Sequence, residues 1–424
     1  MRIGKLPQTI AQKILANKTG RPFLGIGEIV EVEPDAAMSH DNAALVIKQF
    51  HEIGIQNVWN PKKIAIILDH RIPAESVKTA NAHRLIREFV KEQSILNFFD
   101  IGEGICHQVM LEQGLTLPAQ LILGTDSHTT SYGCVGAFSA GIGATEMAAV
   151  WATGKLWLMV PETVLITMHG TLRPGVYAKD LILDVIGKLG AEGANYQSVE
   201  FCGDTLSTLS ISERFTLCNL SMEMGAKCAF VIVDGVTDHY LKDIRSGPYK
   251  PVEADSGAVY SKTLDCDVGT LEPQLAYPHQ VDHVQPVSAW VGKTIHQAFL
   301  GSCTNGRLDD LAIAADILRK RKIHPDVRMV VIPASRTVHR EMSKQGLLDV
   351  FLEAGCVVLH SGCGPCLGAH QGLLADGEVC IASSNRNFQG RMGSPKAEVF
   401  LASPAVVATS AVHGSIQLPE KYRH

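Results

Sequence analysis

Short apolar runs alternate with amphipathic stretches along most of the chain. Residues 64–68 and 121–123 are uninterrupted apolar runs of the kind found in buried strands. Residues 76–93 between them repeat apolar positions at helical spacing. The same alternation recurs with strands predicted at 163–168, 230–233, 295–300, 328–332, 356–359 and 379–382. Strands that alternate with helices predict an α/β fold with parallel sheets.

The chain is long enough for about three such units. At 424 residues it holds roughly three domains of about 150 residues each. Periodicity weakens between residues 243 and 285, where several prolines fall, and we interpret this region as a linker. The predicted domains are residues 1–160, residues 161–285 and residues 286–424.

Polar groups able to do chemistry follow the predicted strands directly. These groups are Asp69-His70, Asp126 with His128, Cys303, Cys363 with Cys366, and Arg386 with Arg391. Ligands of open α/β sheets bind outside the carboxyl ends of the strands. Domains that turn those ends toward one another would gather all of these side chains in a single cleft.

The cysteines of the last predicted domain allow four interpretations. Cys363-Gly-Pro-Cys366 has the spacing of a thioredoxin-like redox pair, although that leaves Cys303 unexplained. Three cysteines with His360 or His370 would suit a structural zinc ion. Three thiolates can also hold an iron–sulfur cluster and leave one iron open. Buried inert cysteines are the fourth interpretation, and the spacing does not choose among them.

Three longer motifs point to a known family. They are Gly-Ser-Cys-Thr-Asn-Gly-Arg at 301–307, Gly-Cys-Gly-Pro-Cys-Leu-Gly at 362–368 and Asn-Arg-Asn-Phe-Gln-Gly-Arg at 385–391. In this order they resemble the signatures of the aconitase superfamily. Within it the chain is similar to the large subunits of 3-isopropylmalate dehydratase and homoaconitase, over essentially its whole length. The resemblance implies three α/β domains around an iron–sulfur cleft, without the fourth, swivelling domain of single-chain aconitases.

The resemblance also implies a metal centre. Cys303, Cys363 and Cys366 match the three ligands of one [4Fe-4S] cluster per subunit, which leaves one iron open for substrate. Arg386 and Arg391 match arginines that flank the cluster and hold a substrate carboxylate.

Further positions match residues that move protons or bind the hydroxyl group. Asp69 and His70 match a pair whose histidine protonates the leaving hydroxyl. Asp126 and His128 match polar residues near the open iron, and His107 matches the histidine that pairs with that aspartate. Glu223 matches a glutamate that hydrogen-bonds the iron-bound hydroxyl.

The function implied is that of a hydro-lyase large subunit. It would isomerise 2- and 3-isopropylmalate by dehydration and rehydration in leucine biosynthesis, with a small subunit supplying the swivel domain and its serine base. His40 stands where aconitase has a substrate-binding glutamine, which argues against citrate. The expected substrate is a 2-hydroxy or 3-hydroxy dicarboxylic acid. 2,3-Dimethylmalate, also a dicarboxylic acid, and homoaconitate, a tricarboxylic acid, are the alternative substrates. A zinc-stabilised or redox-active scaffold is another alternative.

Composition narrows the partners. A net charge of −5 without a block of like charges does not favour nucleic acid, so an RNA-binding aconitase relative is disfavoured. No apolar run reaches the roughly 18 residues needed to span a bilayer, so no membrane partner is expected. Eleven cysteines without a signal peptide indicate a reducing compartment, and we expect a cytoplasmic protein. Thr9 and Gln12 form a capping-box pattern that predicts a first helix.

Overall fold

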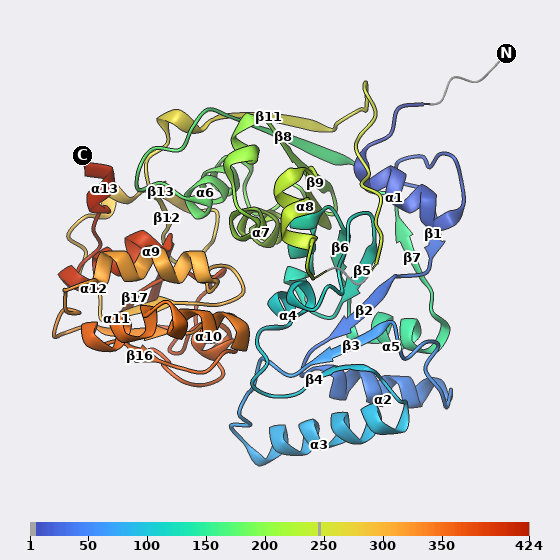
Figure 1. The fold of residues 1–424 in the computed structure, drawn as a ribbon, viewed down its shortest axis with the longest axis horizontal. Helices are drawn as coiled ribbons and strands as arrows, with labels where there is room; N and C mark the ends of the chain where they lie inside the picture. The colour runs from blue at the N-terminus through green and yellow to red at the C-terminus, as the bar shows by residue number, and fades with distance from the viewer. Residues whose placement is uncertain (1–5, 245–246, 424) are drawn as a thin grey trace.

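The computed structural model describes residues 6–244 and 247–423. Its strands form three larger sheets and one two-stranded ribbon, and helices pack around them. In Figure 1 the first sheet with α2 and α3 lies at the lower right, and the third with α9–α12 at the left. The second sheet and its helices lie between and above them. The predicted α/β class is confirmed.

The first sheet is parallel throughout, in the order β4-β3-β2-β5-β6. Its strands are β2 (Ala36–Ser39), β3 (Ile64–Ile67), β4 (Asn97–Phe99), β5 (Leu121–Gly124) and β6 (Phe138–Gly141). The helices of this region are α1 (Ile10–Thr19), α2 (Ala43–Ile53), α3 (Val77–Glu92), α4 (Cys106–Glu112), the 3₁₀ segment η1 (Ser127–Val135) and α5 (Ala144–Thr153). The antiparallel ribbon pairs β1 (Ile29–Val32) with β7 (Leu156–Met159).

The second sheet is also parallel, in the order β10-β9-β8-β11. Its strands are β8 (Thr163–His169), β9 (Ser198–Cys202), β10 (Cys228–Val231) and β11 (Lys262–Asp267). The helical segments beside them are α6 (Ala178–Leu189), η2 (Asp204–Thr208), α7 (Ile211–Leu220), η3 (Ser221–Met224) and α8 (Gly235–Leu241). The helical stretch from Ile211 to Met224 is divided, because α7 tightens into a 3₁₀ turn after Leu220.

The third sheet is mixed, in the order β13-β12-β18-β17-β14-β15-β16. Its strands are β12 (Gln274–Ala276), β13 (Val284–Pro286), β14 (Gln297–Leu300), β15 (Arg328–Val331), β16 (Val357–Val358), β17 (Val379–Ala382) and β18 (Glu398–Ala402). Its helical segments are η4 (Val268–Thr270), η5 (Val287–Trp290), α9 (Leu308–Leu318), α10 (Arg336–Lys344), α11 (Leu347–Ala354), η6 (Gly364–Leu367), α12 (Pro404–His413) and α13 (Glu420–Arg423). Strands β14 to β17 are parallel to their neighbours, whereas β12 runs antiparallel to both of its own.

The predicted linker over 243–285 is wrong in part. Strand β11 completes the second sheet, and β12 and β13 extend the third. Short strands with exposed or proline-containing positions carry little apolar periodicity, so the pattern missed them. The domain boundaries near residues 160 and 285 stay a prediction.

Alternate residues of the first sheet enter two different cores. Ile64 and Ile66 of β3 pack in the cluster formed with α1, α2, α3 and α5. Ala65 and Ile67 enter a second cluster that continues through Phe201 of the second sheet to Phe299 of the third. This shared core holds the three sheets together at the strand ends that the sequence singled out. No helix in the described part of the chain is long and apolar enough to cross a bilayer.

Helix α1 is tied to residues that lie far along the chain. The predicted capping box is present, with Thr9 and Gln12 satisfying each other's backbone N–H groups. The N–H of Ile10 donates to Glu200 Oε1 at 2.7 Å, and the N–H of Gln8 donates to Asp255 Oδ2 at 3.0 Å. The start of the helix is therefore completed by the second sheet and the segment after it.

Candidate active site

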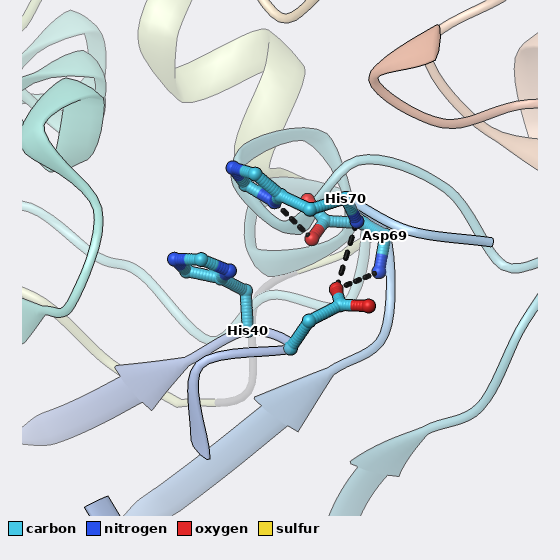
Figure 2. Close-up of side chains that lie close together, drawn as sticks. His40, Asp69 and His70 are labelled. Carbon is cyan, nitrogen blue, oxygen red and sulfur yellow. Dashed lines mark hydrogen bonds and ion pairs between the residues drawn. The ribbon is translucent and has the colours of Figure 1, made fainter. Parts of the chain in front are cut away.

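His70 lies at the end of β3, where the buried strand gives way to a loop. Its Nδ1 lies 2.6 Å from Asp69 Oδ1, and its Nε2 lies 3.3 Å from Asp126 Oδ2. Figure 2 shows the His70 ring facing that of His40, and the two ring centroids are 3.9 Å apart with nearly parallel planes. Burial alone would lower the pKa of His70, but the charges of Asp69 and Cys363 and the hydrogen bond to Asp126 outweigh it. The net pKa of His70 is raised well above its ordinary value, which suits an acid.

Asp126, just past β5, joins three histidines. Its Oδ1 accepts a hydrogen bond from the backbone N–H of His128 at 2.8 Å and lies 2.9 Å from His107 Nε2. Its other oxygen faces His70. Burial raises the pKa of Asp126, but the hydrogen bonds from His107, His128 and His70 bring it well below the ordinary value. The carboxylate stays charged among groups that can share a proton.

Glu223 in η3 links this cluster to the third sheet. Its Oε1 lies 2.9 Å from His128 Nε2 and accepts a hydrogen bond from Arg386 Nε at 2.8 Å. Arg386 also donates through Nη2 to the hydroxyl of Ser127 at 3.2 Å. Burial raises the pKa of Glu223, but His128 and Arg386 lower it by a larger amount. The net pKa of Glu223 is therefore below its ordinary value. Four segments distant in sequence therefore meet through one chain of contacts.

The three predicted cysteines of the metal centre come from two loops. Cys303 follows β14, whereas Cys363 and Cys366 flank the first turn of η6. Gly364 between the latter two has φ +54°, and a Cβ there would lie 2.3 Å from Ile332 Cδ1. The left-handed backbone conformation at this position favours glycine.

Asn385 bridges the two cysteine loops. Its Nδ2 donates to Cys303 Sγ at 3.4 Å, and Cys366 Sγ lies 3.5 Å from its Oδ1. Asn219 of α7 donates a second hydrogen bond to Cys303 Sγ at 3.4 Å. Such N–H···S contacts stabilise a thiolate more than a thiol. The two amide side chains therefore favour a thiolate at Cys303, whereas Cys366 donates its S–H to the amide oxygen of Asn385.

A small cavity joins these groups. Its lining residues are His70, Ile105, His107, Asp126, His128, Ser302, Cys303, Cys363, Cys366, Leu367, Asn385 and Arg391. Arg391 contributes a buried Nε that has no hydrogen-bond partner within the described chain. Of the other predicted site residues, Asp69 contacts the lining residue His70 and Glu223 contacts the lining residue His128. Arg386 in turn contacts Glu223.

The spacing of the sulfur atoms bears on which metal they suit. In the described residues the three sulfurs do not all lie within 4.8 Å of one another. One tetrahedral zinc with Zn–S bonds of about 2.3 Å would need sulfurs only about 3.8 Å apart. The wider spacing suits a cluster of several irons, in which each thiolate binds a different iron.

The electrostatics of the thiols agree with a cationic occupant. Burial raises the pKa of Cys303 to about 12 and raises that of Cys363 above its ordinary value, although His70 opposes the second shift. Buried thiols of this kind become thiolates when a metal supplies positive charge. The donor set therefore fits an iron–sulfur cluster.

The competing interpretations of the cysteines find less support. His370 Nε2 lies 3.1 Å from the carbonyl oxygen of His70, and His360 Nδ1 lies 3.2 Å from that of Ser361. Neither histidine lines the cavity. All eleven cysteines, Cys363 and Cys366 included, are free thiols.

Several residues of the site were not singled out from the sequence. Tyr132 lies with its hydroxyl 3.0 Å from His107 Nδ1, and Asn219 and Asn385 contact the cysteines. Asn385 belongs to the motif at 385–391 and was open to prediction from it. Tyr132 and Asn219 lie in helical segments with no local signal, because only the packing of η1 against α7 brings them to the site.

Comparison with known proteins gives one consistent answer. Residues 12–414 match the aconitase family (aconitate hydratase). The chain is 49% identical over 415 residues to the probable 3-isopropylmalate dehydratase large subunit of Methanothermobacter thermautotrophicus, which covers 98% of this chain and 99% of that one. It is 46% identical to the 3-isopropylmalate dehydratase large subunit of Aquifex aeolicus, with 97% of each chain covered. It is also 46% identical to a probable methanogen homoaconitase large subunit of M. thermautotrophicus, again with 97% of each covered. These matches, with the motifs and the gathered cysteines, establish that the chain belongs to the aconitase family.

Proposed function

We propose that this chain is the large, cluster-bearing subunit of a heteromeric hydro-lyase that interconverts 2- and 3-isopropylmalate. The observation that carries the proposal is one cavity lined by the three cysteines Cys303, Cys363 and Cys366, by the imidazole of His70 and by Arg391. The Nε of Arg391 has no hydrogen-bond partner within the described chain. Full-length relatives named 3-isopropylmalate dehydratase large subunit support the substrate. The free cysteines fit a reducing, cytoplasmic setting.

Cys303, Cys363 and Cys366 would hold a [4Fe-4S] cluster. When bound, the cluster supplies a Lewis acid for the hydroxyl and one carboxylate of the substrate. Asn219 and Asn385 would orient and stabilise the sulfur of Cys303 through their amide N–H groups.

His70 would serve as the acid that protonates the leaving hydroxyl. Its Nδ1 faces Asp69 at 2.6 Å, so the N–H there donates to the carboxylate. The proton for transfer is then held at Nε2, on the side of Asp126. His107 and Asp126 keep that side polar and charged. Rehydration at the neighbouring carbon uses the same groups in reverse.

Arg391 and Arg386 would bind the substrate carboxylates. The guanidinium group suits bidentate pairing with a carboxylate, and Arg391 Nε has no partner to give up. Arg386 is already oriented by Glu223 and Ser127. Substrate would therefore meet a fixed cation rather than a flexible one.

The base that removes the carbon-bound proton would come from a small subunit. The relatives are named large subunits, which implies a smaller partner for this chain as well. We propose that this partner carries the swivel domain with its serine. A homoaconitase is the second candidate, because relatives of that name match at 46–49% identity.

The test is a substrate comparison on the complex purified without oxygen. We expect about four irons and four sulfides per large chain, and turnover of 2-isopropylmalate faster than that of homocitrate or 2,3-dimethylmalate. Complex stripped of iron with a chelator is the control. Faster turnover of homocitrate would favour the second candidate. A colourless complex with one zinc per chain and no dehydratase activity would contradict the proposal.

A further inference from the structure

The carboxylate of Asp41 binds the backbone of the loop that carries His70. Its Oδ2 accepts hydrogen bonds from the N–H groups of Asp69 at 2.9 Å and His70 at 2.8 Å. Its Oδ1 accepts a third from the N–H of Arg71 at 3.2 Å. Strand β3 has ended at Ile67, so these three amides lie outside its pairing with β2 and β4. One anion therefore satisfies three consecutive donors, as in other backbone anion nests.

His83 of α3 holds Asp41 from the other side. Its Nε2 lies 2.8 Å from Asp41 Oδ1, and the two side chains are 3% and 9% exposed. Burial raises the pKa of Asp41, but the hydrogen bond from His83 and the charges of His70 and His40 lower it well below its ordinary value. The carboxylate is thus charged, and helix α3 fixes where it lies.

The loop held in this way places both members of the acid pair. Asp69 Oδ1 contacts the His70 ring, while Asp69 Oδ2 accepts a hydrogen bond from the N–H of Cys106 at 2.7 Å. His40, next to Asp41 in the chain, stacks on one face of the His70 ring (Figure 2). A shift of the backbone at residues 69–71 would disturb both the contact of the imidazole with Asp69 and its stacking on His40.

We propose that Asp41, supported by His83, is a positioning residue that holds the His70 imidazole at the reach needed to protonate the leaving oxygen. The role rests on the proposed function, because it assigns Asp41 to the dehydration step. Asp41 acts through the backbone of another residue and is not among the residues that line the cysteine cavity. Its removal should therefore slow the chemical step and leave substrate binding by the arginines nearly unchanged.

The first variant is Asp41→Asn in the complete two-subunit enzyme. An amide keeps the shape but offers one acceptor oxygen and places an NH₂ against at least one of the N–H donors. We expect kcat to fall about 10- to 100-fold, since misplacement by about 1 Å can cost roughly 10²-fold. KM for 2-isopropylmalate should change less than about threefold. The matched control is Asp100→Asn, which removes an ion pair with Arg87 of α3 at 2.7 Å but leaves the His70 loop alone.

A second pair of variants applies if Asp41→Asn does not fold. His83→Gln retains an N–H donor that can reach Asp41, whereas His83→Phe keeps a ring without the donor. We expect His83→Gln to restore most of the kcat that His83→Phe loses. Equal kcat values in the two variants would contradict the proposal.

Hydrogen exchange separates this proposal from the proposed function. We expect Asp41→Asn, but not Asp100→Asn, to speed amide exchange in a peptide that covers residues 68–72. Hydrogen exchange can be measured without turnover. A complex that is inactive on every substrate would therefore contradict the proposed function, while the exchange measurement would still test whether Asp41 holds the His70 loop. Unchanged exchange, or an unchanged kcat in Asp41→Asn beside an active wild type, would overturn the positioning role.

Discussion

The imidazole of His70 is held by three kinds of contact. Asp69 and Asp126 pair with its two nitrogens, His40 stacks on its face, and Asp41 binds its backbone N–H. Charge, dispersion and backbone hydrogen bonding therefore each restrict a different motion of the ring. A general acid fixed in this way loses little entropy when it meets the substrate.

His70→Ala should lower kcat about 10²- to 10⁴-fold, because the leaving hydroxyl then lacks its proton donor. The measurement is steady-state turnover of 2-isopropylmalate, together with the iron content of the purified complex. We expect iron content to remain unchanged, since the sulfur ligands are untouched. His169→Ala, at a half-exposed histidine paired with Asp265, is the control. Wild-type turnover in His70→Ala would remove this residue from the mechanism.

Individual residues were predictable where chemistry coincides with a strand end. His70, Asp126 and Cys303 each follow a buried strand, and the structure brings all three to one cavity. Tyr132 and Asn219 were not predictable, because their partners lie 25 and 84 residues away in the chain. Asp41 was not predictable either, since nothing local distinguishes a carboxylate that binds backbone N–H groups from a solvated one.

At the scale of elements, long apolar runs and amphipathic helices were the predictable part. Strand β3 and helix α3 lie within one residue of their expected bounds. Strands β12 and β13 were missed because three residues give too few positions for a period, and β2 because Ala-Ala-Met-Ser lacks the β-branched residues that mark β3. In helix α6, a first-turn residue that caps the helix locally also makes a contact with a distant strand. Its first-turn residue Asp180 accepts hydrogen bonds from the N–H of Tyr177 and from that of Gln274 at the start of β12.

Asp180→Asn should flatten part of the pH dependence of stability. Burial raises the pKa of Asp180 to about 7 in the folded chain, against an ordinary value of 3.8. The folded state therefore holds an extra proton between pH 4 and 7, and stability falls as pH rises through this window. The slope for one such group is up to about 1.4 kcal/mol per pH unit. We expect the thermal-unfolding advantage of wild type over Asp180→Asn to shrink from pH 5 to pH 7.

A constant difference between the two proteins over that range would contradict the assigned pKa. The matched control is Asp184→Asn, in the same helix, which removes an ion pair with the exposed side chain of Lys188. That variant should leave the slope between pH 5 and pH 7 unchanged, because no buried carboxyl is removed.

At the scale of the whole molecule, loops that follow strands of the first and third sheets meet at one cavity. The shared core that runs from Ile67 through Phe201 to Phe299 keeps the ends of those strands in place. The cavity offers thiols, imidazoles, carboxylates and a guanidinium, but the proposed base belongs to another chain. The sequence indicated this convergence only because polar groups repeatedly follow predicted strands. The placement of the sheets relative to one another depends on long-range packing, which the sequence pattern does not show.

The isolated chain should bind its cluster yet show little or no dehydratase activity. Without a positioned base the carbon-bound proton is not removed, and an uncovered cavity admits water. Adding a partner of about 160–200 residues, a common single-domain size, should restore turnover. The measurement is 2-isopropylmalate turnover with and without the small chain at equal iron content. Full activity of the 424-residue chain alone would show that the base lies within it.

The contacts that complete the start of α1 set an order of events during synthesis. The N–H groups of Ile10 and Gln8 find their acceptors 190 and 247 residues later. At translation rates of about 5–20 residues per second, those acceptors emerge roughly 10–50 s after the helix itself. The helix therefore leaves the ribosome well before the contacts that complete its start can form. Its apolar stripe of Ile10, Ile14 and Leu15 has to stay shielded, or at least harmless, while more than half of the chain is still being made.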